Sequence, residues 1–456
     1  MFKRYKSTKG ITLVALVITI IILLILAGIS ISTLTNTGIF EKAKEAGFEN
    51  SEIYVTNSES LEISIYQQEV ESYNLDKSFG LSFRGIINGK IGYSHTRILD
   101  ETSVDMLITT AKNAALLIEN EDTQFIYKGD EKYEKVICYY EDLDNIDPKD
   151  LIDLGLKMEE ECKNYNPNVV NIGGCKITYS KGEVQISNTK GLNLKNKENI
   201  LYAYIIPIVE IDGEKQDGTG YKIATNINQI DPKEIAKMGV DEALSKINSN
   251  VIKTGNYKIA LYNEAMVSLL SAFCGVFSAD ATQKGLSLLK DKENTMIASE
   301  KVTIIDNPLL DNGLSSAPFD DEGVATFKKE IVSNGKLTTL LHNLKTANKA
   351  NTKSTGNGFK SSYATSVAVS PSNFYIEKGN LSFGEILENI GEGLLITDFA
   401  GLHSGANAIT GDFSLAAKGF YIKDGKKEYP VDQITVAGNF FKLLKDIEEV
   451  GDALKF

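Results

Sequence analysis

The chain has 456 residues, a formal net charge of −13 and a hydrophobic fraction of 42%, so it is long enough for two domains after an N-terminal appendage. Nucleic-acid phosphates are bound by clustered Lys and Arg. The acidic balance, without a sustained basic stretch, argues against a nucleic-acid surface.

The first predicted element is an apolar helix near the N-terminus. A basic flank at residues 2–10 precedes an uncharged run that begins at Ile11 and ends at Ile31. As a helix the run would extend roughly 30 Å, the thickness of a bilayer core, and it exceeds the core of about 7–15 residues in a secretory signal peptide. We therefore expect a transmembrane segment. The flank also resembles that of type IV prepilins, which would be cut between Gly10 and Ile11.

Hydrophobic periodicity predicts strands and helices in the next part of the chain. Residues 40–48 are typical of a helix, and residues 60–73 alternate apolar and polar side chains as a half-buried strand does. Asn88-Gly89 indicates a turn between two strands. Residues 101–119 carry apolar side chains at helical spacing, and Asp147 predicts the N-cap of a further helix.

The elements that follow complete the first half of the chain and lead into a second, more β-rich half. Strands are expected at residues 169–188 and 201–209, and a helix at residues 233–247. Asn334-Gly335 and Asp424-Gly425 each predict a tight hairpin turn, because such pairs supply positive φ values. We expect an N-terminal segment, an α/β domain and a β-rich domain, at residues 1–38, 39–225 and 226–456.

Five motifs occur in order along the C-terminal half. They are Phe319-Asp320-Asp321-Glu322-Gly323-Val324, Ser354-Thr355-Gly356-Asn357, Gly393-Leu394-Leu395-Ile396-Thr397, Thr410-Gly411-Asp412-Phe413-Ser414 and Val436-Ala437-Gly438-Asn439. Together they resemble the TldD/PmbA family of two-subunit zinc peptidases. The resemblance implies an α+β fold with a two-domain body, to which the transmembrane or pilin-like helix is added. A further terminal strand normally follows in the family, so we expect a shortened C-terminus.

The family's metal motif is degenerate in this chain. The catalytic subunit carries Leu-Leu-His-Glu-x-x-x-His, and here Leu269 and Leu270 match its start. Ser271 and Ala272 replace the first His and the Glu, and Val276 replaces the second His. Zinc hydrolysis needs about three protein ligands and a bound water. We therefore expect no metal and no catalytic residue in this chain, and zinc in a partner subunit.

The resemblance implies a function within a complex. This chain would be the PmbA/TldE-type subunit, inactive alone, of a peptidase whose TldD-like subunit carries His-Glu-x-x-x-His, and the pair would enclose a chamber and cleave peptides. The family resemblance implies a cytoplasmic location, whereas the apolar run predicts a membrane anchor. The alternatives are a membrane-anchored, pilin-like surface protein without peptidase activity, or a recombined or defective fusion.

Several loops are candidate contacts for substrate or partner. The residues are Ser354, Thr355, Gly356, Asn357, His403, Gly411 and Asp412. Turn geometry alone also explains the glycines around His403, and Asp412 could simply cap a turn. The acidic run from Asp320 to Glu322 is not expected to hold a metal, because consecutive residues rarely converge on one ion; a solvated turn is predicted, with interface contact as the alternative.

Overall fold

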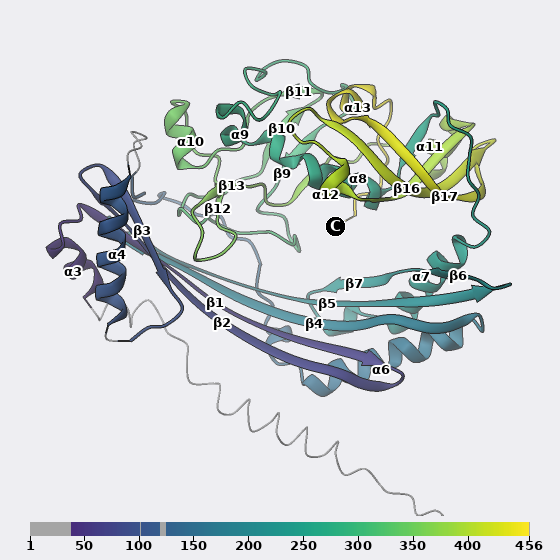
Figure 1. Cartoon of the computed structure of the whole chain (residues 1–456), viewed down its shortest axis with the longest axis horizontal. Helices are drawn as coiled ribbons and strands as arrows, with labels where there is room; N and C mark the ends of the chain where they lie inside the picture. The colour runs from purple at the N-terminus through teal and green to yellow at the C-terminus, as the bar shows by residue number, and fades with distance from the viewer. Residues whose placement is uncertain (1–37, 101, 119–124, 456) are drawn as a thin grey trace, which may run out of the picture.

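The computed structural model describes residues 38–100, 102–118 and 125–455. The chain has a mixed α/β fold in which a C-terminal layer, residues 259–455, lies across one face of a long, curved sheet (Figure 1). The predicted transmembrane or prepilin-like segment, with Gly10 and Ile11, lies outside these residues. Within them, no helix is long and apolar enough to span a membrane.

The large sheet has seven antiparallel strands, in the order β3-β2-β1-β4-β5-β6, with β7 also paired to β5. Side chains alternate between its two faces along each strand, and one face is apolar where the helices cover it. The strands are β1 (Asn50–Tyr66), β2 (Glu69–Ile87), β3 (Lys90–Thr96), β4 (Val169–Asn188), β5 (Asn193–Ile211), β6 (Glu214–Asp217) and β7 (Gly220–Ala224).

The single strand predicted at residues 60–73 is wrong, because the chain reverses at Gln67 and Gln68 and pairs β1 with β2. Both glutamines have positive φ, 53° and 60°, a conformation in which Gly or Asn is usual. The buried Glu159 carboxylate accepts from the backbone N–H groups of both, at 3.2 and 2.7 Å. A carboxylate that is distant in the sequence therefore stabilises this turn, and the two glutamines alone do not predict it.

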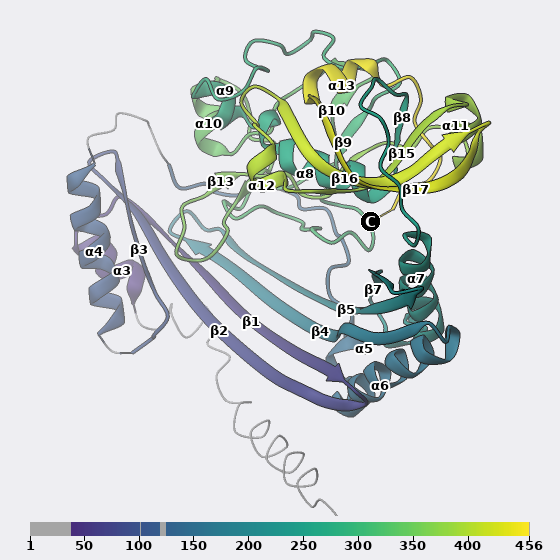
Figure 2. The same cartoon turned by 45° about the vertical axis from the view of Figure 1, so that its right-hand side comes forward.

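Helices cover both ends of the sheet on the face away from the C-terminal layer (Figure 2). They are α3 (Ile39–Glu45) and α4 (Ser103–Leu117) at one end, and α5 (Glu141–Asp144), α6 (Pro148–Tyr165) and α7 (Pro232–Ser245) at the other. The predicted N-cap is confirmed, since Asp147 accepts from the N–H of Lys149. Helix α7 packs in the same hydrophobic core as α6 and β5. This core includes Ile247, which lies beyond the domain division predicted at residue 226.

The C-terminal layer contains three smaller sheets and its own core. The strands are β8 (Ile259–Leu261), β15 (Gly393–Ala400), β16 (Asp412–Lys423) and β17 (Lys426–Asn439) in the first sheet, β9 (Ile304–Asp306), β10 (Lys329–Ser333), β11 (Lys336–Leu337) and β14 (Phe374–Ile376) in the second, and β12 (Gly358–Phe359) and β13 (Ala368–Val369) in the third. Both predicted hairpin turns are confirmed, with positive φ at Asn334, Gly335, Asp424 and Gly425.

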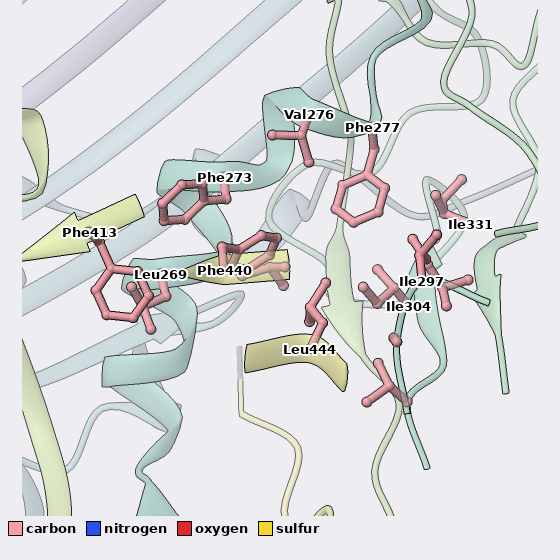
Figure 3. Packing of buried hydrophobic residues seen from close by; sticks show 14 of the residues in the cluster. Leu269, Phe273, Val276, Phe277, Ile297, Ile304, Ile331, Phe413, Phe440 and Leu444 are labelled. Atoms are coloured by element: carbon pink, nitrogen blue, oxygen red, sulfur yellow. The ribbon is translucent and has the colours of Figure 1, made fainter. Parts of the chain in front are cut away.

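Helices α8 (Asn263–Phe273) and α13 (Phe440–Asp446) meet in the centre of this core. Phe273 stacks on Phe440 with ring centroids 4.6 Å apart, and Phe413 lies beside them (Figure 3). Such aromatic side chains bury large apolar areas. The helix with the degenerate metal motif is thus a central support of the layer.

Candidate functional site

The three degenerate positions lie at and just beyond the end of α8, in different environments. Ser271 is exposed on the helix surface and Ala272 is half-buried. Val276, in the turn η2 (Cys274–Phe277) that follows, is only 1% exposed and packs in the core (Figure 3). The position of the family's second His is therefore occupied by a core side chain.

The side chains at these positions do not fit zinc, which takes thiolate, imidazole or carboxylate ligands. A hydroxyl, a methyl and an isopropyl group replace them. The short helix α12 (Leu402–Gly405), which carries His403, packs next to α8 and supplies one exposed imidazole. In the part of the chain that the structure describes, no three His, Cys, Asp or Glu side chains are grouped to hold a metal ion.

The candidate loop Ser354–Thr355–Gly356–Asn357 directs most of its polar groups inward. The hydroxyls of Ser354 and Thr355 both donate to the carbonyl of His342, each at 3.1 Å. Asn357 is fully buried, and its side-chain amide donates to Asp306 at 2.8 Å, while Lys329 donates to the amide oxygen Oδ1 of Asn357 at 3.1 Å. Contact with a substrate stays a prediction for this loop, and half-buried Ser354 is its most accessible residue.

The other candidate loop lies at the start of β16. Gly411 is buried with a φ of 83°, and a Cβ there would lie 2.5 Å from the ring of Phe441. The exposed carboxylate of Asp412 accepts from the Asn439 amide at 2.9 Å. That bond, followed by one from Thr410, lowers the pKa of Asp412. These contacts explain both residues as parts of a turn, and their contact with a partner stays a prediction, as it does for His403.

The most elaborate polar arrangement joins the two layers. Arg84 of β2 pairs with Glu52 of β1, with Nε to Oε1 at 2.7 Å. Glu322 of the C-terminal layer lies 3.9 Å from the same guanidinium and accepts from the N–H of Leu344 at 2.7 Å. Asn188 of β4 donates to the second Glu52 oxygen at 3.0 Å. All four side chains are buried, and the single Arg84 guanidinium faces both carboxylates away from water.

Lys360 extends this polar arrangement between the layers toward Tyr54. Its ammonium donates to the Ser82 hydroxyl at 3.0 Å and lies 4.0 Å from the ring centroid of Tyr54. Burial, followed by the positive charge of Arg84, lowers the pKa of Lys360 to about 7. The Tyr54 hydroxyl donates to Asp321 at 3.0 Å, and burial together with Asp321 raises the pKa of Tyr54.

The predicted solvated turn at residues 320–322 is therefore wrong. Asp320 is 0% exposed and accepts from three backbone N–H groups, of Glu322, Val324 and Gly358, at 2.9–3.0 Å. Neither Arg84 nor Lys360 was predicted from the sequence as a counter-charge of these carboxylates. A cation inside the apolar run Leu81–Ile87 of β2 was the available signal, because an Arg in such a strand must find a partner.

Comparisons with known proteins identify the family of this fold. Models of the PmbA/TldA metallopeptidase match domain 1 at residues 51–115, the central domain at 141–247 and the C-terminal domain at 254–456. An uncharacterized protein of Methanocaldococcus jannaschii is 31% identical over 90% of this chain and 93% of its own length. The chain belongs to the PmbA/TldD family. The resemblance stated from the five motifs is confirmed.

Other PmbA/TldD proteins match at similar length. The metalloprotease PmbA of Escherichia coli O157:H7 is 26% identical over 89% of this chain and 88% of its own. A Thermotoga maritima protein, named as a proposed modulator of a DNA gyrase, superposes with a TM-score of 0.84 at 30% identity, over 91% and 94% of the two chains. TldE of Thermococcus kodakarensis shares the fold, with a TM-score of 0.83 at 22% identity over 91% and 93%.

Proposed function

We propose that this chain is the non-metal-binding, PmbA/TldE-like subunit of a heteromeric zinc metallopeptidase. Its partner would be a TldD-like chain that carries His-Glu-x-x-x-His and the zinc, and the substrate would be a short or unfolded peptide. The observation that carries the proposal is the set of side chains at Ser271, Ala272 and Val276, which offers no zinc ligand. The remainder of the family fold is present around it.

The names of the relatives support both halves of the proposed pair. The chain matches the metalloprotease PmbA over nearly its whole length, and it also matches a metalloprotease TldD homolog of Buchnera aphidicola at 25% identity over 85% of this chain. Two paralogous chains of one fold are well suited to a heteromeric interface. In that complex this chain would contribute chamber wall and interface, and the partner would supply the metal that activates water.

The test is reconstitution with the TldD-like chain of the same genome. Co-expression should give a stable complex by size-exclusion chromatography, with zinc that is lost when the first His of the partner's motif is replaced by Ala. The complex should cleave an unfolded peptide, and either chain alone should not. S271A in this chain is the matched control and should leave zinc content and cleavage unchanged. Zinc bound by this chain alone, or failure of the two chains to associate, would contradict the proposal.

A further inference from the structure

A cavity of about 620 Å³ lies between the two layers, within the range of about 300–1,000 Å³ usual for small-molecule sites. Its floor is the sheet face that is turned toward the C-terminal layer, and residues 312–316 of that layer contribute to its wall. Ser60 and Ser180, which are cross-strand neighbours, place hydroxyl oxygens 3.0 Å apart on the floor. Its lining combines polar and apolar side chains from both layers.

Two carboxylates line the cavity: Glu59, which pairs with Lys77 at 2.8 Å, and Glu198 of β5. Glu198 pairs in register with Gly182, which in turn pairs with Ser58, so its carboxylate lies in line with these residues across three strands. Because Gly182 has no side chain, the Glu198 carboxylate leans over it; a Cβ there would lie 3.1 Å from Oε1. Among the described residues, no side chain forms a hydrogen bond or ion pair with this carboxylate.

The surroundings of Glu198 leave its charge uncompensated. The Glu198 side chain is exposed to the open cavity, and partial desolvation by the surrounding protein, followed by the charge of Asp321, raises its pKa. Water solvates this carboxylate in the open cavity, and a cation or several donors would stabilise its charge further.

The lysines that line the cavity do not supply that cation. Lys181 pairs with Asp144 at 2.9 Å. Lys222 is the register partner of Ala203, which is buried under the helices. Ala203 and Glu198 are an odd number of residues apart on β5, so their side chains lie on opposite faces of the sheet. Lys222 therefore lies on the face opposite to Glu198.

We propose that this cavity binds the ammonium group of a peptide, with Glu198 as its counter-ion and the serine hydroxyls as further hydrogen-bonding partners. An ammonium supplies three donors and a positive charge, and the carboxylate and the hydroxyl oxygens can accept from it. The inference rests on the proposed function only for the choice of a peptide as the ligand. The ammonium could be the N-terminal amine or a lysine side chain, and both have the same chemistry at Glu198.

The experiment compares three peptide probes on the isolated full chain by calorimetry at neutral pH. They are tetra-alanine with a free N-terminus, the same peptide acetylated and amidated, and acetyl-trialanyl-lysine amide. We expect the probes with an ammonium to bind and the capped peptide not to bind. E198Q should weaken binding about tenfold or more, the effect of losing one charged hydrogen bond. The first and third probes together tell which source of the ammonium is accepted.

E210Q is the matched control, because Glu210 lies on the same strand and pairs with Lys215 away from the cavity. It should bind as the unmodified chain does. Equal affinity of E198Q, or no binding of either ammonium probe at millimolar concentration, would overturn the proposal. Because the partner subunit is absent from the assay, such a result would leave the proposed peptidase complex standing, and failure of the complex to form would leave the cavity result unchanged.

Discussion

Arg84 and Glu52 are direct cross-strand partners in the large sheet and form an ion pair that is buried on all sides. Because Glu322 approaches the same guanidinium from the other layer, one cation serves carboxylates from both halves of the chain. One side chain therefore contributes both to the pairing of β1 with β2 and to the docking of the C-terminal layer.

The first prediction concerns the loss of that cation. R84M should lower the free energy of unfolding by about 3–5 kcal/mol, because it leaves buried carboxylates without a counter-charge. Denaturant titration followed by circular dichroism measures the change. K442M is the control: Lys442 pairs with Asp446 on the surface of α13, and its loss should change stability by at most about 1 kcal/mol. Equal effects of the two substitutions would contradict the importance of the buried pair.

The second prediction concerns the pH dependence of stability through Lys360. Burial holds its pKa at about 7 in the folded chain, below the ordinary 10.5. Between these values the unfolded chain binds more protons than the folded one, so stability should rise with pH across this window. The quantity to measure is the difference in unfolding free energy between the unmodified chain and K360M. From pH 7 to pH 9 the unfolding free energy of the unmodified chain should rise relative to that of K360M. A difference that does not change with pH would show that the lysine keeps its ordinary pKa.

The third prediction compares the buried and the exposed position of the degenerate metal motif. V276H should destabilise the chain by about 1–3 kcal/mol, because an imidazole would replace a core side chain without a hydrogen-bond partner. S271H, on the exposed helix surface, should change stability by about 0.5 kcal/mol at most. Thermal and chemical unfolding of both variants provide the comparison. If V276H proved as stable as S271H, the core could accept a ligand at this position.

The fourth prediction concerns the turn at Gln67 and Gln68. E159A should cost about 2–4 kcal/mol, since it removes the charged acceptor of both turn N–H groups from the interior. Q67G is the control within the same turn, because only the backbone N–H of Gln67 contacts Glu159 and Gly accepts the positive φ. Its effect should be small. Hydrogen exchange of the two turn amides should accelerate in E159A and not in Q67G.

Local sequence patterns predicted many of the elements that begin or end at characteristic capping or turn residues. Asp147 before Pro148, Asn334-Gly335 and Asp424-Gly425 each fix a helix start or a turn within a few residues, and the structure contains all three. The hairpin at Gln67 was missed because its determinant, Glu159, is 92 positions away. Periodicity is a local signal and cannot report such a pair.

The interlayer site was missed for the same reason. Three consecutive acidic residues, Asp320 to Glu322, are usually exposed, and only the fold brings Arg84 and Lys360 to them from distant segments. The α8 substitutions were visible in the sequence, but the burial of Val276 was not. Glu198 was not visible as a site, because its cavity is formed by strands and loops that are far apart in the chain.

The contacts between the two layers should keep the chain together after proteolytic cleavage. The backbone between α7 and β8 is largely exposed at residues 248–258, so a protease could cleave it while the rest stays folded. The two fragments would still share the Arg84–Glu322 contact, the Tyr54–Asp321 hydrogen bond and the packing of Tyr363 against Gly80. They would migrate together in a native gel and separate only in denaturant, as two chains of one non-covalent complex.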